Sequence, residues 1–352
     1  MISGNLTSAW LIIIFIFSSI AVWVAGVKIS LATDTIYKYF HLEEAMGGMI
    51  FLAIVTNLPE IAITVMAAYT NHMEIAVSNI LGGIAIQTIV LTLIDGFGVG
   101  KLAPLSSKAS SVGVILEGVV LTFILTLVIM GKQIPCDYVI LNATPVEWII
   151  LIVWLAGLYL IYKNPTLKNL KSNEFLPLNY SQERTKKETD QINIDKKKAY
   201  KSLFIFSFCA VVTLISGIFL ETSSEELANR FHISGAIFGA TILAVVTSLP
   251  EISTGIASAK IKDYQMAVSD IIGGNAFLPV LLLLGSITSG KSIMNIVGSV
   301  DIYLTGLAIL LTGTYMVGLI IKSDRQFLRL GYDSIAILFL YLIGIWGMQF
   351  VK

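Results

Sequence analysis

Two glutamates stand in apolar surroundings, and each of them directly follows a proline. Glu60 lies in the stretch TNLPEIAIT (residues 56–64) and Glu251 lies in TSLPEISTG (residues 247–255). Proline has no N–H and its ring collides with the carbonyl four residues earlier, so each proline should free a backbone oxygen in its helix. In lipid such oxygens are tolerated where they line a cavity, and hard cations such as Na⁺ and Ca²⁺ bind oxygen ligands. The two stretches therefore predict a cation site.

Polar side chains precede both glutamates by three and four residues, which places them on the same face of a helix as the glutamate. They are Thr56 and Asn57 in the first stretch and Thr247 and Ser248 in the second. Together with the carboxylates and the freed carbonyls, their hydroxyl and amide oxygens form a suitable set of ligands for a hard cation. Neither stretch contains His or Cys, which disfavours zinc and copper.

The charge of the two glutamates has a consequence of its own. Carboxylates that face each other repel unless a cation or a proton neutralises them. A divalent ion, several Na⁺ or protons can each do so, and this interchangeability is the physical basis of ion exchange. In the alternative interpretation the prolines are packing kinks and each glutamate pairs with a buried base. The neighbouring apolar segments contain no Lys or Arg for that purpose, so the ion site is favoured.

These residues belong to a chain that is too apolar for a water-soluble domain. Of its 352 residues 56% are hydrophobic and 13% are charged, and its mean hydropathy is +0.83. A spanning helix needs roughly 20 mostly apolar residues, and the apolar runs lack the alternation of barrel strands. We therefore predict an all-α integral membrane protein. Ten segments qualify as spans: 8–29, 46–69, 74–94, 111–131, 147–164, 201–221, 235–259, 264–285, 299–321 and 333–351.

The two glutamate stretches are parts of an internal repeat. A shift of 191 residues aligns residues 52–91 with residues 243–282 at 17 identities in 40 positions. Each copy occupies the second and third helices of a five-helix half, and an odd number of helices turns the second copy upside down. We therefore predict ten transmembrane helices as two inverted five-helix repeats. Inverted repeats place equivalent segments face to face near the membrane midplane, where transporters hold their ions.

This pattern divides the chain into a first repeat (1–164), a hydrophilic linker (165–200) and a second repeat (201–352). The linker is rich in lysine, and the positive-inside rule places it in the cytoplasm. With ten helices, both termini then lie outside. The first apolar segment has no basic residue before Lys28 and no convincing cleavage site, so we interpret it as a membrane helix rather than a signal peptide. The compact chain favours a plasma (cell inner) membrane.

Each copy of the repeat also carries a glycine pair, and small residues let membrane helices approach closely. The pairs are Gly82 with Gly83 and Gly273 with Gly274. Four residues further on, the first copy has Gln87 and the second has Leu278. Gln87 can offer an oxygen to an ion and Leu278 cannot, so we expect an asymmetric site. Asp270 lies two turns before Leu278, about 12 Å away by helical rise. It is a candidate residue of the cytoplasmic ion path. Alternatively, it is an acid that stabilises a helix N-terminus.

With these motifs the chain resembles the cation/calcium antiporter superfamily, which includes the sodium/calcium exchangers. The resemblance covers both halves and is carried by TNLPE, TSLPE and the glycine segments. It implies alternating-access exchange of Ca²⁺ against Na⁺ or H⁺, with no cofactor. It also implies that Glu60 and Glu251 are the central ligands, while Asn57 stands where the motif has a serine. The further ligands that it implies are Thr56, Thr247, Ser248 and the carbonyls of Ala53 and Ala244.

The chain departs from the pattern of this superfamily in its glycine segments. Gly83 and Gly274 replace a serine, and Gln87 and Leu278 occupy positions where Asn or Asp is usual. Fewer oxygens therefore remain for several Na⁺ ions. The glutamates could carry protons instead, and a glutamine at position 87 resembles the proton-coupled branch of the superfamily. Both Na⁺ and H⁺ therefore stay open as the driving ion.

Further charged residues lie near or within the predicted helices. Glu117 is an intramembrane acid and therefore a functional candidate by default, or it bonds a neighbouring serine or backbone group. We expect Asp95 and Asp301 at the interface and three histidines in loops: His41, His72 and His232. We expect an acidic loop before the seventh helix, with Glu221, Glu225 and Glu226. This loop is either simply solvated or attracts cations to the outer entrance of the ion path.

Rival classes of function lack their signatures. The sequence contains no Gly-x-Gly-Asp, no His-Glu-x-x-His and no nucleotide-binding P-loop, so we predict neither an enzyme nor an ATP-driven pump. We expect membrane lipid and transported cations as partners, and neither nucleic acid nor ATP. A monovalent cation/H⁺ antiporter is the main alternative, and a passive cation channel or an intramembrane hydrolase is less favoured. A carrier needs a counter-ion for net flux, and a channel does not.

Overall fold

The computed structural model describes residues 6–40, 53–100, 103–134, 138–163 and 196–351, and these residues are mostly helical. In this part of the chain eight helices are long and apolar enough to cross a membrane, and two apolar helices, α3 and α17, are shorter. The protein is therefore an all-α membrane protein, whereas the number of ten spans stays a prediction. His41, Cys136 and the predicted linker as far as residue 195 lie outside the described residues.

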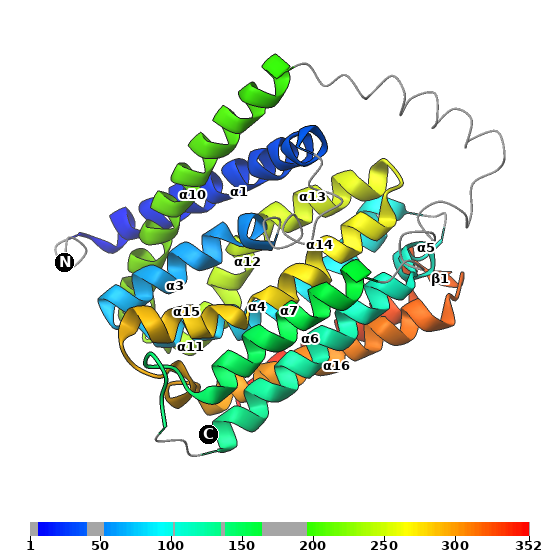
Figure 1. The fold of residues 1–352 in the computed structure, drawn as a ribbon. Helices are drawn as coiled ribbons and strands as arrows, with labels where there is room; N and C mark the ends of the chain where they lie inside the picture. Colours follow the sequence, from blue (N-terminus) through cyan, green and yellow to red (C-terminus); the bar gives the residue numbers. More distant parts are fainter. Residues whose placement is uncertain (1–5, 41–52, 101–102, 135–137, 164–195, 352) are drawn as a thin grey trace.

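The described residues of the first half of the chain form six labelled helices and one π-helical turn (Figure 1). They are α1 (Ser8–Tyr39), α3 (Leu58–Thr70), α4 (Met73–Ile94), η3 (Asp95–Val99), α5 (Leu105–Ala109), α6 (Val112–Gln133) and α7 (Pro145–Lys163). α4 is mostly apolar, has no separate polar face and is buried along almost its whole length, as expected for a helix in the core of a bundle. It occupies the centre of the molecule.

The second half begins earlier than predicted, because α10 starts at Lys196 within the predicted linker. Its elements are α10 (Lys196–Arg230), α11 (Gly235–Phe238), η4 (Gly239–Leu243), α12 (Ala244–Thr247), α13 (Leu249–Lys260), α14 (Tyr264–Phe277), α15 (Val280–Ser289), η5 (Ile293–Asn295), α16 (Ser299–Ile321) and α17 (Tyr332–Met348). Between α16 and α17 a short hairpin pairs β1 (Gln326–Phe327) with β2 (Leu330–Gly331) in antiparallel register.

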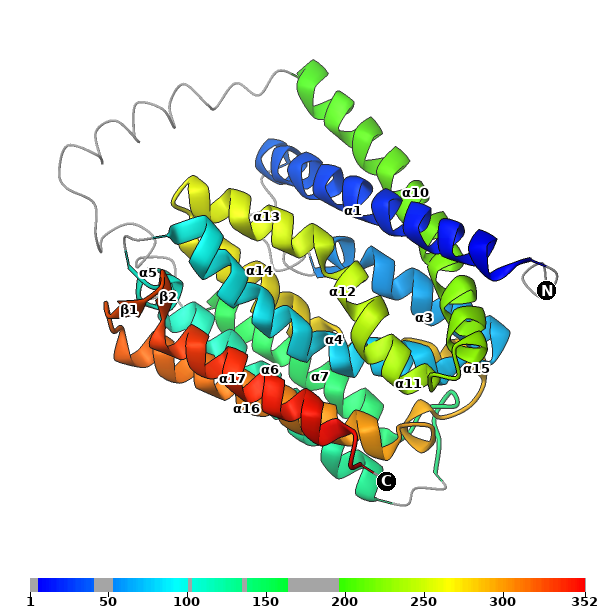
Figure 2. The same cartoon turned by 180° about the vertical axis from the view of Figure 1, so that it is seen from behind.

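The helices are arranged in three layers (Figures 1 and 2). α1 and α10 lie side by side on one side of the molecule, and the layer beneath them contains α3, α12, α13 and α14. The third layer, beyond α4, consists of α6, α7, α16 and α17. α1 begins and α17 ends at one face, here called the terminal face; the opposite linker face holds the start of α10, the α13–α14 turn and the hairpin.

The helix that carries each glutamate is interrupted just before its proline. Residues 53–56 are helical, the chain leaves the helix at Asn57, and α3 begins at Leu58; in the second half the break falls at Ser248, between α12 and α13. The two breaks are 191 positions apart, which is the offset of the repeat. Each proline lies in the first turn of the new helix, where a missing N–H costs nothing. Each helix is therefore broken before the proline, and the proline lies where the next helix starts.

The first helix of each half packs against the other half. A Cβ at Gly26 in α1 would lie 2.7 Å from Cγ of Pro250, and a Cβ at Gly217 in α10 would lie 2.5 Å from Cβ of Ala62. Both distances are too short for any residue with a side chain, so these two contacts require glycine. The two glycines are again 191 positions apart, which extends the repeat beyond the region of evident sequence identity.

Side-chain hydrogen bonds tie α4 to α16 and α14 to α6. Ser78 in α4 donates to Asp301 in α16, and Ser269 in α14 donates to Glu117 in α6 at 2.5 Å. The two serines are 191 positions apart. Asp301 lies in the first turn of α16, at a helix end as expected. It is 2% exposed, and the serine and the N–H of Gly298 satisfy its carboxylate inside the protein. Glu117 takes its expected serine partner.

Side-chain hydrogen bonds also tie the residue after α4 to α17, and α15 to α7. Asp95 accepts hydrogen bonds from the N–H groups of Leu105 (2.6 Å) and Gly331 (2.8 Å) and from Oγ of Ser334 in α17 (2.7 Å). Asp95 lies directly after α4, at a helix end as expected, and these three donors replace water around its fully buried carboxylate. In the other half Ser286 in α15, 191 positions after Asp95, donates to Glu147 in α7. At these equivalent positions one half therefore has the acid and the other has the hydroxyl.

Candidate functional site

Glu60 and Glu251 are buried without partners for most of their oxygens. Glu60 is 1% exposed and Glu251 is 6% exposed. Among the described residues, both carboxylate oxygens of Glu60 and Oε2 of Glu251 have no hydrogen-bond partner, and no basic side chain forms an ion pair with either glutamate. A buried charge in this state is costly, so each carboxylate requires a cation or a proton.

The structure brings the two glutamates together from opposite halves. The hydroxyl of Thr247 in α12 faces the Glu60 carboxylate at the start of α3. Glu251, at the start of α13, lies close enough to Glu60 and Asp270 for the three acids to interact electrostatically. The two helix breaks therefore lie near each other in the middle layer, from which α3 runs toward the terminal face and α13 toward the linker face.

The polar residue at each break folds back on a carbonyl four residues earlier. Nδ2 of Asn57 donates to the carbonyl of Ala53 at 2.7 Å, and Oγ of Ser248 donates to the carbonyl of Ala244 at 2.7 Å. The two threonines approach the same carbonyls: Thr56 at 3.5 Å and Thr247 at 3.3 Å. A hydroxyl that donates its proton keeps its lone pairs, and a carbonyl has two. These oxygens therefore remain able to coordinate a cation.

A small cavity adjoins Glu251 on the side of the linker face. Its volume is about 20 Å³, and besides Glu251 it is lined by Thr254 and Asp270, by Thr56 and by residues of α1 and α10. Oγ1 of Thr254 lies 3.4 Å from Oδ2 of Asp270, so the two helices α13 and α14 meet through polar atoms. A volume of this size holds about one water molecule or one cation.

The sequence patterns missed two polar residues that line this cavity. Ser30 in α1 and Thr213 in α10 face it, and the hydroxyl of Thr213, which is fully buried, has no hydrogen-bond partner among the described residues. Thr213 had a signal, because it opens a run at four-residue spacing along α10 that continues with Gly217 and Glu221. Ser30 had none, since only the packing of α1 against α13 brings it here.

The glycine pairs differ from the prediction. Only Gly82 requires close approach, because a Cβ there would lie 2.5 Å from Cβ of Ala240. At Gly83 a Cβ would lie 3.9 Å from Cβ of Ala244, and at Gly274 it would lie 3.6 Å from Nδ2 of Asn57. These are ordinary contact distances, and the same holds for Gly273. Gly83 and Gly274 therefore leave room beside the two Pro-Glu elements.

The positions after these glycines are asymmetric. Gln87 is buried within the continuous helix α4, and none of the described hydrogen bonds ties it to either glutamate. Leu278 follows the end of α14, and Pro279 separates it from α15. In the described part of the chain no three His, Cys, Asp or Glu side chains gather closely enough to hold a metal ion. Any bound cation therefore needs hydroxyl, amide and carbonyl oxygens as well, which suits Na⁺ or Ca²⁺.

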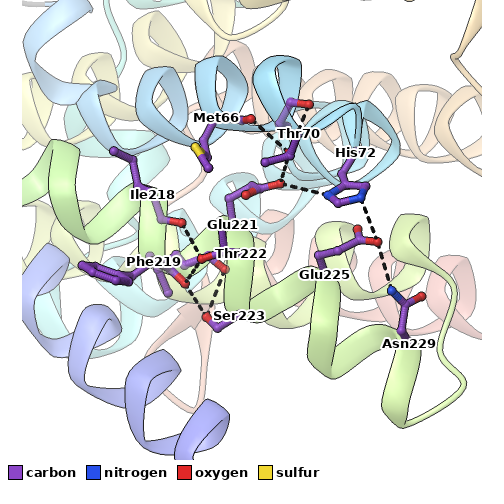
Figure 3. Close-up of polar contacts among 12 residues, drawn as sticks. Met66, Thr70, His72, Ile218, Phe219, Glu221, Thr222, Ser223, Glu225 and Asn229 are labelled. Carbon is purple, nitrogen blue, oxygen red and sulfur yellow. Dashed lines mark hydrogen bonds and ion pairs between the residues drawn. The ribbon is translucent and has the colours of Figure 1, made fainter. Parts of the chain in front are cut away.

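A second polar cluster lies at the terminal face, around the end of α3 (Figure 3). The expected acidic loop was wrong, because Glu221, Glu225 and Glu226 lie within α10. Glu221 is fully buried and accepts a hydrogen bond from Thr70 at 2.8 Å. His72 lies in the turn between α3 and α4, as expected of a loop residue, and stands between Glu221 and Glu225. His232 also lies in a turn and is exposed.

A family model described as sodium/calcium exchanger protein matches residues 10–163 and 201–348 of this chain. The two matched ranges leave out the region of the predicted linker. They include both glutamates, both helix breaks and both glycine pairs.

Curated relatives match at lower identity. The inner membrane protein YrbG of Escherichia coli (strain K12) is 23% identical over 262 residues, which is 73% of this chain and 73% of YrbG. The putative antiporter CaxA of Alkalimonas amylolytica is 24% identical over 262 residues, which is 72% of each chain.

Two kinds of solved exchanger share the fold. The crystal structure of the H⁺/Ca²⁺ exchanger CAX superposes with a TM-score of 0.71 at 13% identity and covers 97% of this chain and 82% of that one. A structure of the sodium-calcium exchanger NCX_Mj, soaked with 10 mM Na⁺ and zero Ca²⁺, superposes with a TM-score of 0.58 at 18% identity, over 96% and 99% of the two chains. At these identities the likeness concerns the fold alone.

Proposed function

The chain belongs to the sodium/calcium exchanger protein family, and we propose that it exchanges Ca²⁺, or a related cation, for Na⁺ or H⁺ by alternating access. Membership of a family of exchangers supports a cation antiporter rather than an enzyme. The choice of ions and the residues that bind them are the parts that we add, and they follow from the two Pro-Glu elements.

One observation carries the proposal: two buried carboxylates from opposite halves face each other without a basic partner. Their joint negative charge must be balanced at every stage of a transport cycle. One Ca²⁺ balances both, and Na⁺ ions or protons can take its place. An antiporter needs such a site, because the same oxygens must hold either the driven ion or the driving ion and must not stay empty.

We assign the central ligands to Glu60 and Glu251. The hydroxyls of Thr56, Thr247 and Ser248 and the carbonyls of Ala53 and Ala244 complete the site, with the Asn57 amide at the first break and Gln87 as a further oxygen in α4. Asp270 serves as a third acid, on the path between Glu251 and the linker face, where it adjoins the cavity.

Alternating access fits two five-helix halves, residues 1–164 and 201–352, arranged as inverted repeats in a ten-helix membrane protein. If the terminal face is outside, as the lysine-rich linker predicts, the cavity at Glu251 opens the site toward the cytoplasm. Inverted halves have two equivalent conformations, and the second would open the site at Glu60 toward the terminal face. We place the protein in the plasma (cell inner) membrane, with lipid as its surroundings and no use of ATP.

The test is uptake of radioactive calcium into proteoliposomes that contain Na⁺ or have an acidic interior, each with a matched control that lacks the gradient. We expect one of the two gradients to drive uptake, and we expect the double variant Glu60→Gln, Glu251→Gln to abolish it. Calcium must be abandoned as the substrate if neither gradient drives uptake into vesicles that contain folded protein.

A second candidate function is exchange of a monovalent cation for H⁺. Leu278 and the glycines at 83 and 274 remove oxygens that several Na⁺ ions would need, while two glutamates alone can bind protons. Proton release from liposomes that is driven by Na⁺ or K⁺ without calcium would favour this candidate. A passive channel is distinguished from both, because its flux needs no counter-ion.

A further inference from the structure

α10 carries a polar stripe that runs from the central cavity to the terminal face. Thr213 lines the cavity, Gly217 touches Ala62 of α3, and Glu221 bonds Thr70 at the end of α3. Glu225 and then Asn229 continue the stripe at the same four-residue spacing. α10 therefore meets α3 along one continuous line, which ends at a cluster of charged groups.

Glu221 is the buried member of this cluster. Its side chain is 0% exposed, and its Oε1 accepts a hydrogen bond from Oγ1 of Thr70 at 2.8 Å. Its Oε2 has no hydrogen-bond partner among the described residues. A carboxylate without water and with one oxygen unsatisfied is unfavourable unless a positive charge stands beside it.

His72 is placed to supply that charge (Figure 3). Its Nδ1 lies 3.6 Å from Oε1 of Glu221, and its Nε2 lies 3.5 Å from Oε1 of Glu225. Glu225 is fixed in turn by Nδ2 of Asn229 at 3.0 Å. Both imidazole distances exceed an ordinary hydrogen bond of about 2.7–3.2 Å, so one small movement of α10 would close both contacts at once.

The backbone around His72 holds the ring at this point. Asn71 ends α3 in the left-handed conformation (φ 63°), which asparagine tolerates better than most residues. The N–H of His72 then donates to the carbonyl of Ala67 at 2.9 Å. The ring therefore extends from a closed helix end that belongs to α3 and α4, while both of its partners belong to α10.

The other charged groups around His72 at the terminal face have separate partners. Glu74 in α4 accepts a hydrogen bond from the N–H of Ala236, and Lys291 after α15 reaches Oδ1 of Asn71 at 3.5 Å. In α10, Arg230 pairs with Glu226 at 2.8 Å. A cavity of about 330 Å³ lined by His72, Glu74, Glu225 and Lys291 connects the ring to this face, and His72 itself is 40% exposed. Protons from the solvent therefore reach it.

We propose that His72 is a proton-operated latch between the α3–α4 turn and α10 at the terminal face. The imidazolium bridges Glu221 and Glu225 and holds the end of α10 against α3. The neutral imidazole carries no charge and can donate one hydrogen only, so it no longer bridges the two acids and the end of α10 is released from the α3–α4 turn. Because histidine changes its charge between about pH 5 and 8, acid at the terminal face closes this side of the molecule. Only the effect on transport rests on the proposed function.

The test measures the distance between α3 and the end of α10 directly. Spin labels at Tyr69→Cys and Phe231→Cys, both exposed positions, are introduced after Cys136 and Cys209 have been replaced by alanine. Between about pH 8 and pH 5.5, across the titration range of histidine, we expect the pulsed-EPR distance distribution to lose its longer component. His72→Gln should abolish this shift, and His232→Gln, at an exposed histidine of the same face, should retain it.

Each outcome decides the proposal. An unchanged distribution in the parent protein, or a shift that survives in His72→Gln, overturns the latch. Glu225→Gln provides a second variant at a partly exposed position, and it should reduce the shift even if His72→Gln does not fold. Because the distance does not depend on any ion being transported, the latch can stand or fail independently of calcium exchange. If exchange is established, His72→Gln should also remove the slowing of uptake by acid at the terminal face.

Discussion

Gly274 stands beside the Asn57 amide with room for a side chain, and that space gives a prediction about the driving ion. A Cβ there would lie 3.6 Å from Nδ2 of Asn57, so serine fits and adds a hydroxyl at the helix break. We expect Gly274→Ser to lower the half-saturating Na⁺ concentration for calcium exchange roughly three- to tenfold, since one added oxygen contact contributes about 1 kcal/mol.

Two variants control this experiment. Gly274→Ala fills the same space without an oxygen, so equal behaviour of alanine and serine would show that volume, not coordination, matters. Gly82→Ser should instead lower the thermal stability, because its Cβ would meet Ala240 at 2.5 Å.

Asp270 gives a prediction about sidedness. It adjoins the cavity between Glu251 and the linker face, so its charge acts on a cation that arrives from this face. We expect Asp270→Asn to raise the half-saturating calcium concentration at the linker face about tenfold, or ~1.4 kcal/mol, in vesicles of known orientation. Asp324→Asn, at an exposed position near the same face, should leave it unchanged. An equal effect from both faces would contradict a role on this path.

At the scale of elements, the repeat predicted which segments meet. The two Pro-Glu copies share an offset of 191 residues, so the prediction of inverted repeats brought them together, and the apolar runs located most helices. The length of α10 did not follow, since Glu221, Glu225 and Glu226 looked like a loop. The burial of Glu221 against α3 depends on Thr70 and His72, which no local pattern links to it. The partners of Asp95 escaped prediction for a similar reason, because two of its three donors, Gly331 and Ser334, come from a segment more than 230 residues away.

The helix breaks provide a prediction at this scale. Pro59 lies in the first turn of α3, and its missing N–H prevents the helix of residues 53–56 from continuing through Asn57. We expect Pro59→Ala to change the stability by only about 1 kcal/mol and to lower calcium uptake at least tenfold, because a continuous helix rotates Glu60 away from Thr247. Pro145→Ala, at the start of α7 and away from the site, should leave uptake intact. Normal uptake by Pro59→Ala would mean that the break is not needed.

At the scale of the whole molecule, each half completes the other. α1 packs on α13 and α10 packs on α3. Hydrogen bonds tie α4 to α16 and α14 to α6. Neither half can therefore keep its Pro-Glu element in place alone. An ion site built from both halves thus depends on ties that lie far from the ions, and these ties should control stability and transport together.

The hydrogen bonds of Ser78 and Ser269 test whether these contacts control both stability and transport. The two serines occupy equivalent positions of the repeat, but their surroundings differ. Ser78→Ala leaves Asp301, which is 2% exposed, with one buried oxygen unsatisfied, at a cost of about 1–3 kcal/mol. Ser269→Ala acts on Glu117, which is less buried than Asp301, so we expect the lost contact to cost less there. We expect Ser78→Ala to lower the thermal midpoint of the purified protein in detergent more than Ser269→Ala does. Because Ser269 adjoins Asp270, we expect the milder variant to have the larger effect on calcium affinity at the linker face. Equal shifts in both measurements would mean that the two ties stabilise the protein alike and that neither one positions the ion path.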